Sequence, residues 1–301
     1  MPILGILASS FDNTVAARGV FIGGAGTNII DYVEIASTGN ATDFGDLLSN
    51  NYSGGTCASS TRGIYGNGYD GTNTNVIQYI TIASTGNATD FGDSTQGRFG
   101  TGGCSNSTRG LFAGGQVYPT YYNIIDYITI ATVGNGTDFG DLTVTGTAPG
   151  GLASPTRGVF AGRFNGSYNN TIDYVTIATT GNATSFGTLS ASNSYIGGCS
   201  NSTRGIFAGG QGNGQTELNI IDYITIATTG NATDFGDLTV SKSGVMACSS
   251  SVRGVFGGGG DGTINVIEYV TIDTTGNATD FGDLTVARTQ GAGLSNAHGG
   301  L

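Results

Sequence analysis

Pairs of aspartates are the residues of this chain whose type and spacing most resemble a catalytic site. Two carboxylates held close together can act as a general acid and a general base. Such pairs, with their members three positions apart, recur at Asp43/Asp46, Asp90/Asp93, Asp138/Asp141, Asp234/Asp237 and Asp280/Asp283. Side chains three apart on a strand point to opposite faces, and an active site needs one asymmetric constellation rather than a recurring one. We therefore interpret these aspartates as turn caps or surface hydrogen-bonding groups.

Cysteine and histidine add little chemistry. The single histidine, His298, is expected in a flexible chain end, so nucleophilic catalysis has no base. The cysteines each lie five residues before an Arg-Gly motif, at Cys57, Cys104, Cys199 and Cys248. Equivalent residues of adjacent repeats lie about 10 Å apart, which is too far for a disulfide, and histidine partners for a metal are missing. We predict four buried free thiols, no metal site, no cofactor and no enzymatic activity.

The composition limits the class of protein. The 301 residues carry a net charge of -11 and only one lysine, which argues against binding to nucleic acid. No apolar run is long enough to span a membrane, so we expect no membrane insertion. Gly accounts for 55 residues, yet 38% of the chain is hydrophobic and rich in β-branched and aromatic residues. Because helix formers are scarce, we predict an all-β protein with a packed core.

The elements that would position any site belong to an internal repeat of roughly 47 residues, a length typical of propeller blades. Each copy has an Arg-Gly motif, then a tyrosine after an Ile/Val run, then a Gly-Asn turn and a Phe-Gly pair. The motif arginines, which we interpret as structural with anion binding around the axis as the alternative, are Arg18, Arg62, Arg109, Arg157, Arg204 and Arg253. In the fifth copy we predict strands at Gly198–Asn201, Arg204–Gly209, Asn219–Ala227 and Asp234–Val240. Residues 16–301 are thus predicted to form a six-bladed β-propeller of four-stranded antiparallel blades.

The last residues are predicted to close the ring. Gly291–Asn296 match the first strand of the other repeats, but no further Arg-Gly motif follows them. The first repeat begins at Arg18 without such a strand. We expect the C-terminal strand to complete blade one, which removes an open sheet edge. Residues 1–15 then lie outside the propeller.

The repeat resembles the kelch-type propeller. The resemblance rests on the tyrosine of the third strand and on Gly-Gly pairs after the second, at Gly23-Gly24, Gly114-Gly115 and Gly209-Gly210. It covers nearly the whole chain, although the chain has no tryptophan. It implies the propeller fold and a protein-interaction module. The histidine ligands of kelch-type copper oxidases are missing.

The two ends of such a propeller differ in sequence. Turns from strand one to two and from three to four repeat closely and define a regular face, whereas the remaining loops vary and define an irregular face. Binding residues usually lie on loops of a rigid scaffold. We predict a recognition surface on the irregular face, with loop tyrosines that cover loop bases as the alternative. Its candidate residues are Tyr118, Tyr121, Tyr122, Tyr168, Arg98, Arg163, Lys242 and Arg288.

The first ten residues (MPILGILASS) resemble the N-termini of bacteriophage tail and fibre proteins. The resemblance implies a virion appendage in which Ile3, Leu4, Ile6 and Leu7 dock onto other virion proteins. The irregular face would then contact a host-surface glycan or receptor, and homo-oligomers are compatible with the near-identical repeats. One alternative is a cellular kelch-type interaction module or adhesin at the extracellular surface. Another is a propeller glycosidase or lyase, which needs an asymmetric carboxylate pair in the axial cleft.

Overall fold

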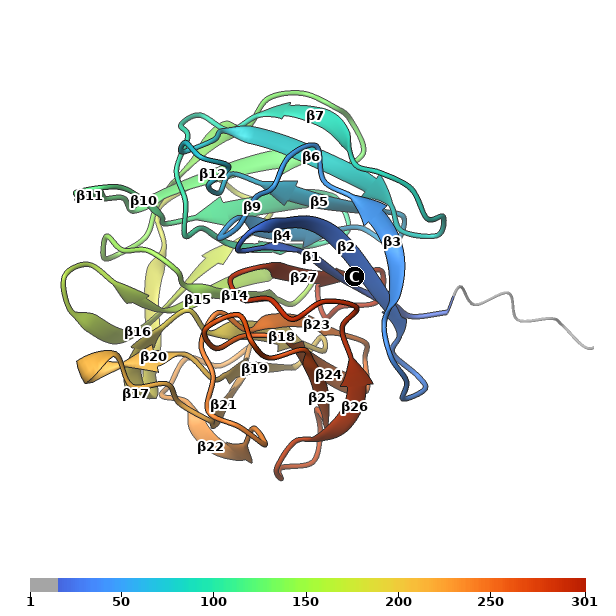
Figure 1. Ribbon diagram of the computed structural model, residues 1–301. Coiled ribbons are helices and arrows are strands. Elements are labelled where there is room, and N and C mark those ends of the chain that lie inside the picture. Colours follow the sequence, from blue (N-terminus) through green and yellow to red (C-terminus); the bar gives the residue numbers. More distant parts are fainter. Residues whose placement is uncertain (1–15) are drawn as a thin grey trace, which may run out of the picture.

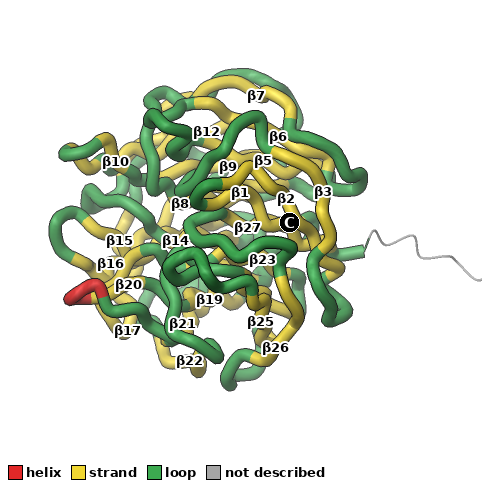
Figure 2. The backbone as a smooth tube through the Cα atoms, viewed as in Figure 1, coloured by secondary structure: helices red, strands yellow, loops and turns green. Residues whose placement is uncertain are grey.

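Residues 16–301 are described by the computed structural model and form six antiparallel sheets arranged as blades around one axis (Figure 1). This confirms the predicted all-β, six-bladed propeller. Strands and loops make up almost all of the described chain, with one short 3-10 helix at Asn213–Gln215 (Figure 2). Between residues 16 and 301, no helix is long and apolar enough to cross a membrane. The predicted docking residues Ile3, Leu4, Ile6 and Leu7 lie outside the described residues.

Each blade has four strands, of which the first named lies at the axis and the last named at the outer edge. Blade one contains β27 (Ala292–Ser295), β1 (Arg18–Gly24), β2 (Thr27–Glu34) and β3 (Thr42–Asp46); blade two contains β4 (Gly55–Ala58), β5 (Arg62–Gly66), β6 (Val76–Thr81) and β7 (Thr89–Asp93). Blade three contains β8 (Gly102–Ser105), β9 (Arg109–Ala113), β12 (Ile124–Thr129) and β13 (Thr137–Asp141); blade four contains β14 (Gly150–Ala153), β15 (Arg157–Phe164), β16 (Tyr168–Thr176) and β17 (Thr184–Ser194). Blade five contains β18 (Gly197–Ser200), β19 (Arg204–Ala208), β21 (Ile220–Thr225) and β22 (Thr233–Asp237); blade six contains β23 (Met246–Ser249), β24 (Arg253–Gly257), β25 (Val266–Thr271) and β26 (Thr279–Asp283).

Two irregular-face loops add short strands of their own. The hairpin of β10 (Gln116–Val117) and β11 (Thr120–Tyr121) projects from blade three. The strand β20 (Gln211–Gly212) from blade five pairs with the long outer strand β17 of blade four. The predicted strands of the fifth repeat agree with β18, β19, β21 and β22 to within a few residues at their ends.

The ring closes as predicted. The C-terminal strand β27 pairs antiparallel with β1, from Gly19 opposite Ser295 to Ile22 opposite Ala292. The Arg18 amide also donates to Asn296 Oδ1 at 2.8 Å. The first and last described parts of the chain therefore share one sheet, and blade one has no open inner edge.

Small residues allow the inner strands to approach the axis closely. A Cβ atom added to Gly103 or to Gly151 would collide with the backbone of the preceding inner strand. The equivalent place in blade six is filled by Ala247 and in blade two by Thr56. Close backbone approach is a common reason for glycine inside a strand, and it accounts here for part of the high glycine content.

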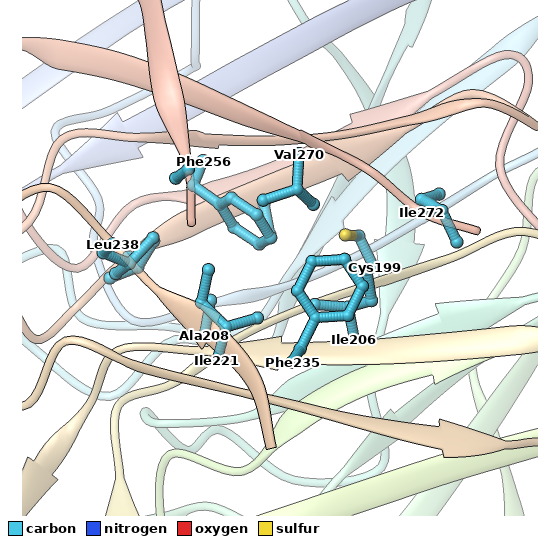
Figure 3. Packing of buried hydrophobic residues seen from close by; sticks show 12 residues of the cluster. Cys199, Ile206, Ala208, Ile221, Phe235, Leu238, Phe256, Val270 and Ile272 are labelled. Atoms are coloured by element: carbon cyan, nitrogen blue, oxygen red, sulfur yellow. The ribbon is translucent and has the colours of Figure 1, made fainter. Parts of the chain in front are cut away.

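The hydrophobic core lies between the blades rather than within one layer. Figure 3 shows the cluster between blades five and six, where Cys199 and Ile206 face Phe256 and Val270. The Cys199 sulfur lies over Gly254 of the next blade, because a Cβ there would be only 2.8 Å away. All four cysteines are free and buried, as predicted.

The repeated arginines join each blade to the next. The Arg62 guanidinium carbon lies 4.5 Å from the centre of the Tyr79 ring, and its Nη1 donates to the Ile130 carbonyl of blade three at 2.8 Å. The same stacking recurs for all six motif arginines, and Arg253 closes the circle with a bond to Ile35 of blade one at 3.0 Å. These arginines are therefore structural, as interpreted from the sequence, and stabilise the ring by cation–π and charge-assisted contacts.

Candidate binding face

A ring of backbone hydrogen bonds encircles the axis on the irregular face. One residue per blade adopts a left-handed conformation, with φ between +56° and +72°, just before each inner strand. Each amide donates to the carbonyl of the equivalent residue in the preceding blade, from 2.6 Å for Ser53 to Gln290 up to 3.0 Å for Gln290 to Gly244. The members of this axial ring are Ser53, Gly100, Ala148, Tyr195, Gly244 and Gln290. The ring fixes the loops on this face relative to one another.

A cavity of about 130 Å³ lies along the axis and is lined by the inner strands and by His298. C-terminal residues pack across its regular-face end: His298 Nε2 lies 3.0 Å from the Ala58 carbonyl, and the Gly299 amide donates to the Ser200 carbonyl at 2.9 Å. The prediction of a flexible end at His298 is therefore wrong, because these contacts bind it to two different blades. Burial lowers the pKa of His298.

The described residues that line the axial cavity differ from the carboxylate pair of a glycosidase. Among the described residues that line it, none is an aspartate or a glutamate. The recurring aspartates lie instead on the outer strands, where Asp43 is exposed and the Asp46 amide donates to Asn87 Oδ1 of the next blade at 3.1 Å. Within residues 16–301, no three His, Cys, Asp or Glu side chains are grouped to hold a metal ion.

The basic residues predicted for the recognition surface are buried, which corrects that prediction. Each forms an ion pair with an acid of a third strand: Arg98 with Asp126 and Arg163 with Asp173, both at 2.8 Å, Lys242 with Glu268 at 2.6 Å, and Arg288 with Asp31 at 2.7 Å. The side chains of all four basic residues are at most 1% exposed. Loops of the irregular face fold over them, so they stabilise the scaffold and do not reach the surface.

This burial changes the electrostatics of the irregular face. The chain has ten lysines and arginines. Four form the buried pairs, and the other six stack on tyrosines where strand two begins, on the regular face. No basic side chain among residues 16–301 is thus left on the irregular face for a ligand. An anionic ligand would meet a surface with acidic residues and without compensating cations.

Aromatic side chains gather on this face over blades two to four. Tyr69 contacts Tyr52 and Phe99, with ring centres 5.5 and 5.9 Å apart. Phe164 contacts Tyr121 and Tyr168, with ring centres 6.0 and 4.9 Å apart. We call these six residues the aromatic crescent: Tyr52, Tyr69, Phe99, Tyr121, Phe164 and Tyr168.

The two halves of the aromatic crescent are joined through β10. Gln116 bridges to Phe99 on one side and pairs with Tyr121 on the other. Tyr52 and Phe99 directly precede the axial-ring residues Ser53 and Gly100. Burial and the neighbouring hydroxyls of Tyr168, Tyr121 and Tyr52 raise the pKa of Tyr195, another residue of the axial ring. The crescent therefore borders the axial mouth on one side. The place directly before the axial-ring residue, which holds Tyr52 in blade two and Phe99 in blade three, holds a small polar residue in the other four blades: Thr147, Ser194, Ser243 and Thr289.

The structure separates the predicted tyrosines. Tyr121 and Tyr168 belong to the crescent, while Tyr118 lies at the tip of the β10–β11 hairpin and is 81% exposed. Tyr122 is half-buried and takes part in neither stack. The other four crescent residues, Tyr52, Tyr69, Phe99 and Phe164, were not among the residues predicted for the recognition surface. For Tyr52 and Phe99 the sequence does carry a signal, because both residues directly precede an axial-ring residue.

No protein-family model matches the chain, and no curated protein matches it.

Proposed function

We propose that this propeller is a non-enzymatic binding component of a virion appendage, and that its aromatic crescent binds a neutral glycan on a host surface. The observation that carries the proposal is the crescent itself. It groups six aromatic side chains at the mouth of the axis, on a face where residues 16–301 offer no available cation.

The chemistry of the crescent suits uncharged sugars. Aromatic faces pack against the CH groups of sugar rings, and tyrosine hydroxyls exchange hydrogen bonds with sugar hydroxyls. Tyr168 Oη already donates to Gln211 Oε1 at 2.7 Å, which holds its ring in place and lowers the entropy lost on binding. Sulfated or phosphorylated glycans are disfavoured, because the net charge of -11 repels them and all basic side chains are engaged internally.

The placement on a virion rests on the resemblance of the N-terminus to phage tail and fibre proteins. Ile3, Leu4, Ile6 and Leu7 would dock the propeller onto other virion proteins and leave the irregular face outward. A cellular interaction module or adhesin is the rival, and the kelch-like repeat favours it. A fixed copy number of this chain in purified particles would support the virion proposal, whereas its absence from particles would contradict it.

Binding can be tested on a glycan array that includes neutral and anionic bacterial polysaccharides. We expect the wild-type protein to bind a neutral glycan, and Tyr168→Ala to weaken that binding about tenfold or more, which corresponds to loss of one stacking contact. Val133→Ala is the matched control, since Val133 is 56% exposed and lies in a regular-face turn. Preference for anionic glycans, or equal loss in both variants, would contradict the proposed crescent site.

A further inference from the structure

Every blade buries one polar side chain at the same place on its third strand, opposite an aromatic residue of the second strand. We call it the acid position. Its occupants are all at most 3% exposed. They are Asp31, Gln78, Asp126, Asp173, Asp222 and Glu268.

Four of these side chains are acids that are neutralised by a buried cation, although the cation does not always come from the same place. Arg98, Lys242 and Arg288 lie at equivalent places in the loops before the inner strands. In blade four that place is Gly146, and the cation is Arg163 from the end of β15. The buried acid of blade four thus also has a cation beside it, although this cation comes from a strand and not from the loop.

In blade two the acid position and its loop partner are both uncharged. Its occupant is the neutral Gln78, and the loop residue is the neutral Asn51, whose Nδ2 donates to the Asn67 carbonyl at 3.1 Å. Asn51 Oδ1 accepts from the Tyr65 hydroxyl at 3.4 Å. Five of the six blades therefore follow one rule at the acid position. In four of them a carboxylate is paired with a cation, and in blade two a carboxamide has no cation beside it.

Blade five is the exception, because it combines the carboxylate of Asp222 with the neutral Asn193. Asn193 occupies the place of Arg98: its Nδ2 donates to the Gly209 carbonyl at 3.5 Å, as Arg98 Nε does to the Gly114 carbonyl at 2.7 Å. The alternative source used in blade four is also missing, since Gly210 stands at the place of Arg163. No lysine or arginine among residues 16–301 lies within 4.0 Å of Asp222.

Two side-chain oxygens at these places of blade five, one of Asp222 and one of Asn193, consequently have no donor among the described residues. The Ser190 amide and hydroxyl both donate to Asp222 Oδ2 at 2.9 Å, whereas Oδ1 has no partner in the described chain. Asn193 Oδ1 also has none, because Phe207 replaces the tyrosine of blade two. In blades one, three and four a guanidinium also donates to the carbonyl of the phenylalanine equivalent to Phe207, at 3.2 to 3.3 Å.

We propose that Asp222 binds a hard cation in the place that a guanidinium takes in the other blades. Asp222 Oδ1 would be the anionic ligand, and the Phe207 carbonyl, whose equivalents accept from a guanidinium in blades one, three and four, would be a neutral ligand. Cations such as Ca²⁺ and Na⁺ prefer this set of oxygens. A buried carboxylate without a positive partner is costly, and a bound cation supplies the charge that the sequence of this blade lacks.

The site is linked to one end of the crescent through Asn193 and Ser194. Asn193 pairs with Asn169, the neighbour of Tyr168, and is two residues from Tyr195 of the axial ring. Ser194 pairs with Gln211, which accepts the hydrogen bond of Tyr168. A cation at Asp222 would therefore order the loops that carry one end of the crescent. The cation proposal does not depend on the glycan proposal, because it rests on the scaffold alone.

The test is thermal unfolding of the full-length protein, first treated with chelator and then titrated with CaCl₂ or NaCl, with choline chloride as the control for ionic strength. We expect one of the two metals to raise the midpoint by about 4 °C at roughly a hundredfold excess over its Kd. Asn193→Arg should raise the midpoint without metal and abolish the metal response, since it restores the tethered cation of the other blades.

Asp222→Asn should also abolish the metal response, and it copies the neutral pairing of blade two. Asp280→Asn is the matched control and should respond as the wild-type protein does, because Asp280 is an exposed outer-strand acid of blade six. Absence of a metal-specific rise in the wild-type protein would overturn the proposal. A rise that persists in Asp222→Asn or Asn193→Arg would do the same, since it would place the cation elsewhere.

Discussion

The side chain of Arg163 occupies the space that Gly146 leaves beside Asp173. A Cβ atom on Gly146 would lie 2.8 Å from the Arg163 side chain, whose Nη1 forms a 2.8 Å ion pair with Asp173. In blades one and three the cation is supplied from the place of Gly146 itself, by Arg288 and Arg98. The buried cation and the space for it thus change together, which indicates that the ion pair is part of how a blade packs.

Removal of the cation from blade four should therefore destabilise the whole propeller. Arg163→Met is expected to lower the free energy of unfolding by about 3–5 kcal/mol, because it leaves the Asp173 carboxylate buried without a partner. Urea-induced unfolding measures this loss. The double variant Arg163→Met/Asp173→Asn should recover at least half of it, as the uncharged pairing of Gln78 in blade two indicates. A double variant no more stable than the single one would show that the loss is one of packing.

Asp222 should make stability depend on pH in the absence of metal. Burial raises the pKa of Asp222 above its ordinary value of 3.8. As pH rises through that value the unfolded chain releases the proton first, so the free energy of unfolding falls until pH passes the folded pKa. Asp222→Asn lacks this loss, so its stability advantage should grow from pH 3 towards neutrality and then level off. Melting curves of both proteins in metal-free buffer across this range test it, and a constant difference would contradict it.

The four thiols should be unreactive in the folded protein. Burial raises the pKa of Cys248 to about 12 and raises those of Cys57, Cys104 and Cys199 as well. The thiolate is the reactive form, and each sulfur is also covered by the neighbouring blade. A colorimetric thiol reagent should detect no thiol in native protein and all four in concentrated guanidinium. Rapid reaction of any one cysteine under native conditions would show that a blade interface opens readily.

The inner strands should tolerate no added volume where glycine faces the neighbouring backbone. Gly103→Ala is expected to lower the free energy of unfolding by about 1–3 kcal/mol, because its Cβ would collide with the backbone of Thr56. Ala247→Gly at the equivalent place in blade six is the comparison and should cost less than about 1 kcal/mol. Chemical denaturation of both variants measures the difference. Equal effects would mean that the inner strands shift freely along the axis.

The fold could be read from the sequence because its signals are local and repeated. The spacing from Arg62 to Arg109 and onwards predicts one blade after another, since each blade is built from consecutive strands. The pairing of β27 with β1 was predictable for the same reason, as Gly291–Asn296 repeat a strand that blade one lacks. The four buried thiols followed from a place that recurs in successive blades.

The site was decided by the tertiary structure. Asp31 and Arg288 lie at opposite ends of the chain, so no local pattern shows that the arginine turns inward to a buried acid. Tyr52 and Phe99 fall between the predicted strands, but only the stacking of three blades around the axis groups them with Phe164 of β15 in one crescent. The sequence by itself determined the number of blades and their strands, because those depend on short-range periodicity. Which loop side chains are buried and which meet the solvent was settled by the path of each loop over its neighbour, which depends on contacts between residues far apart in the chain.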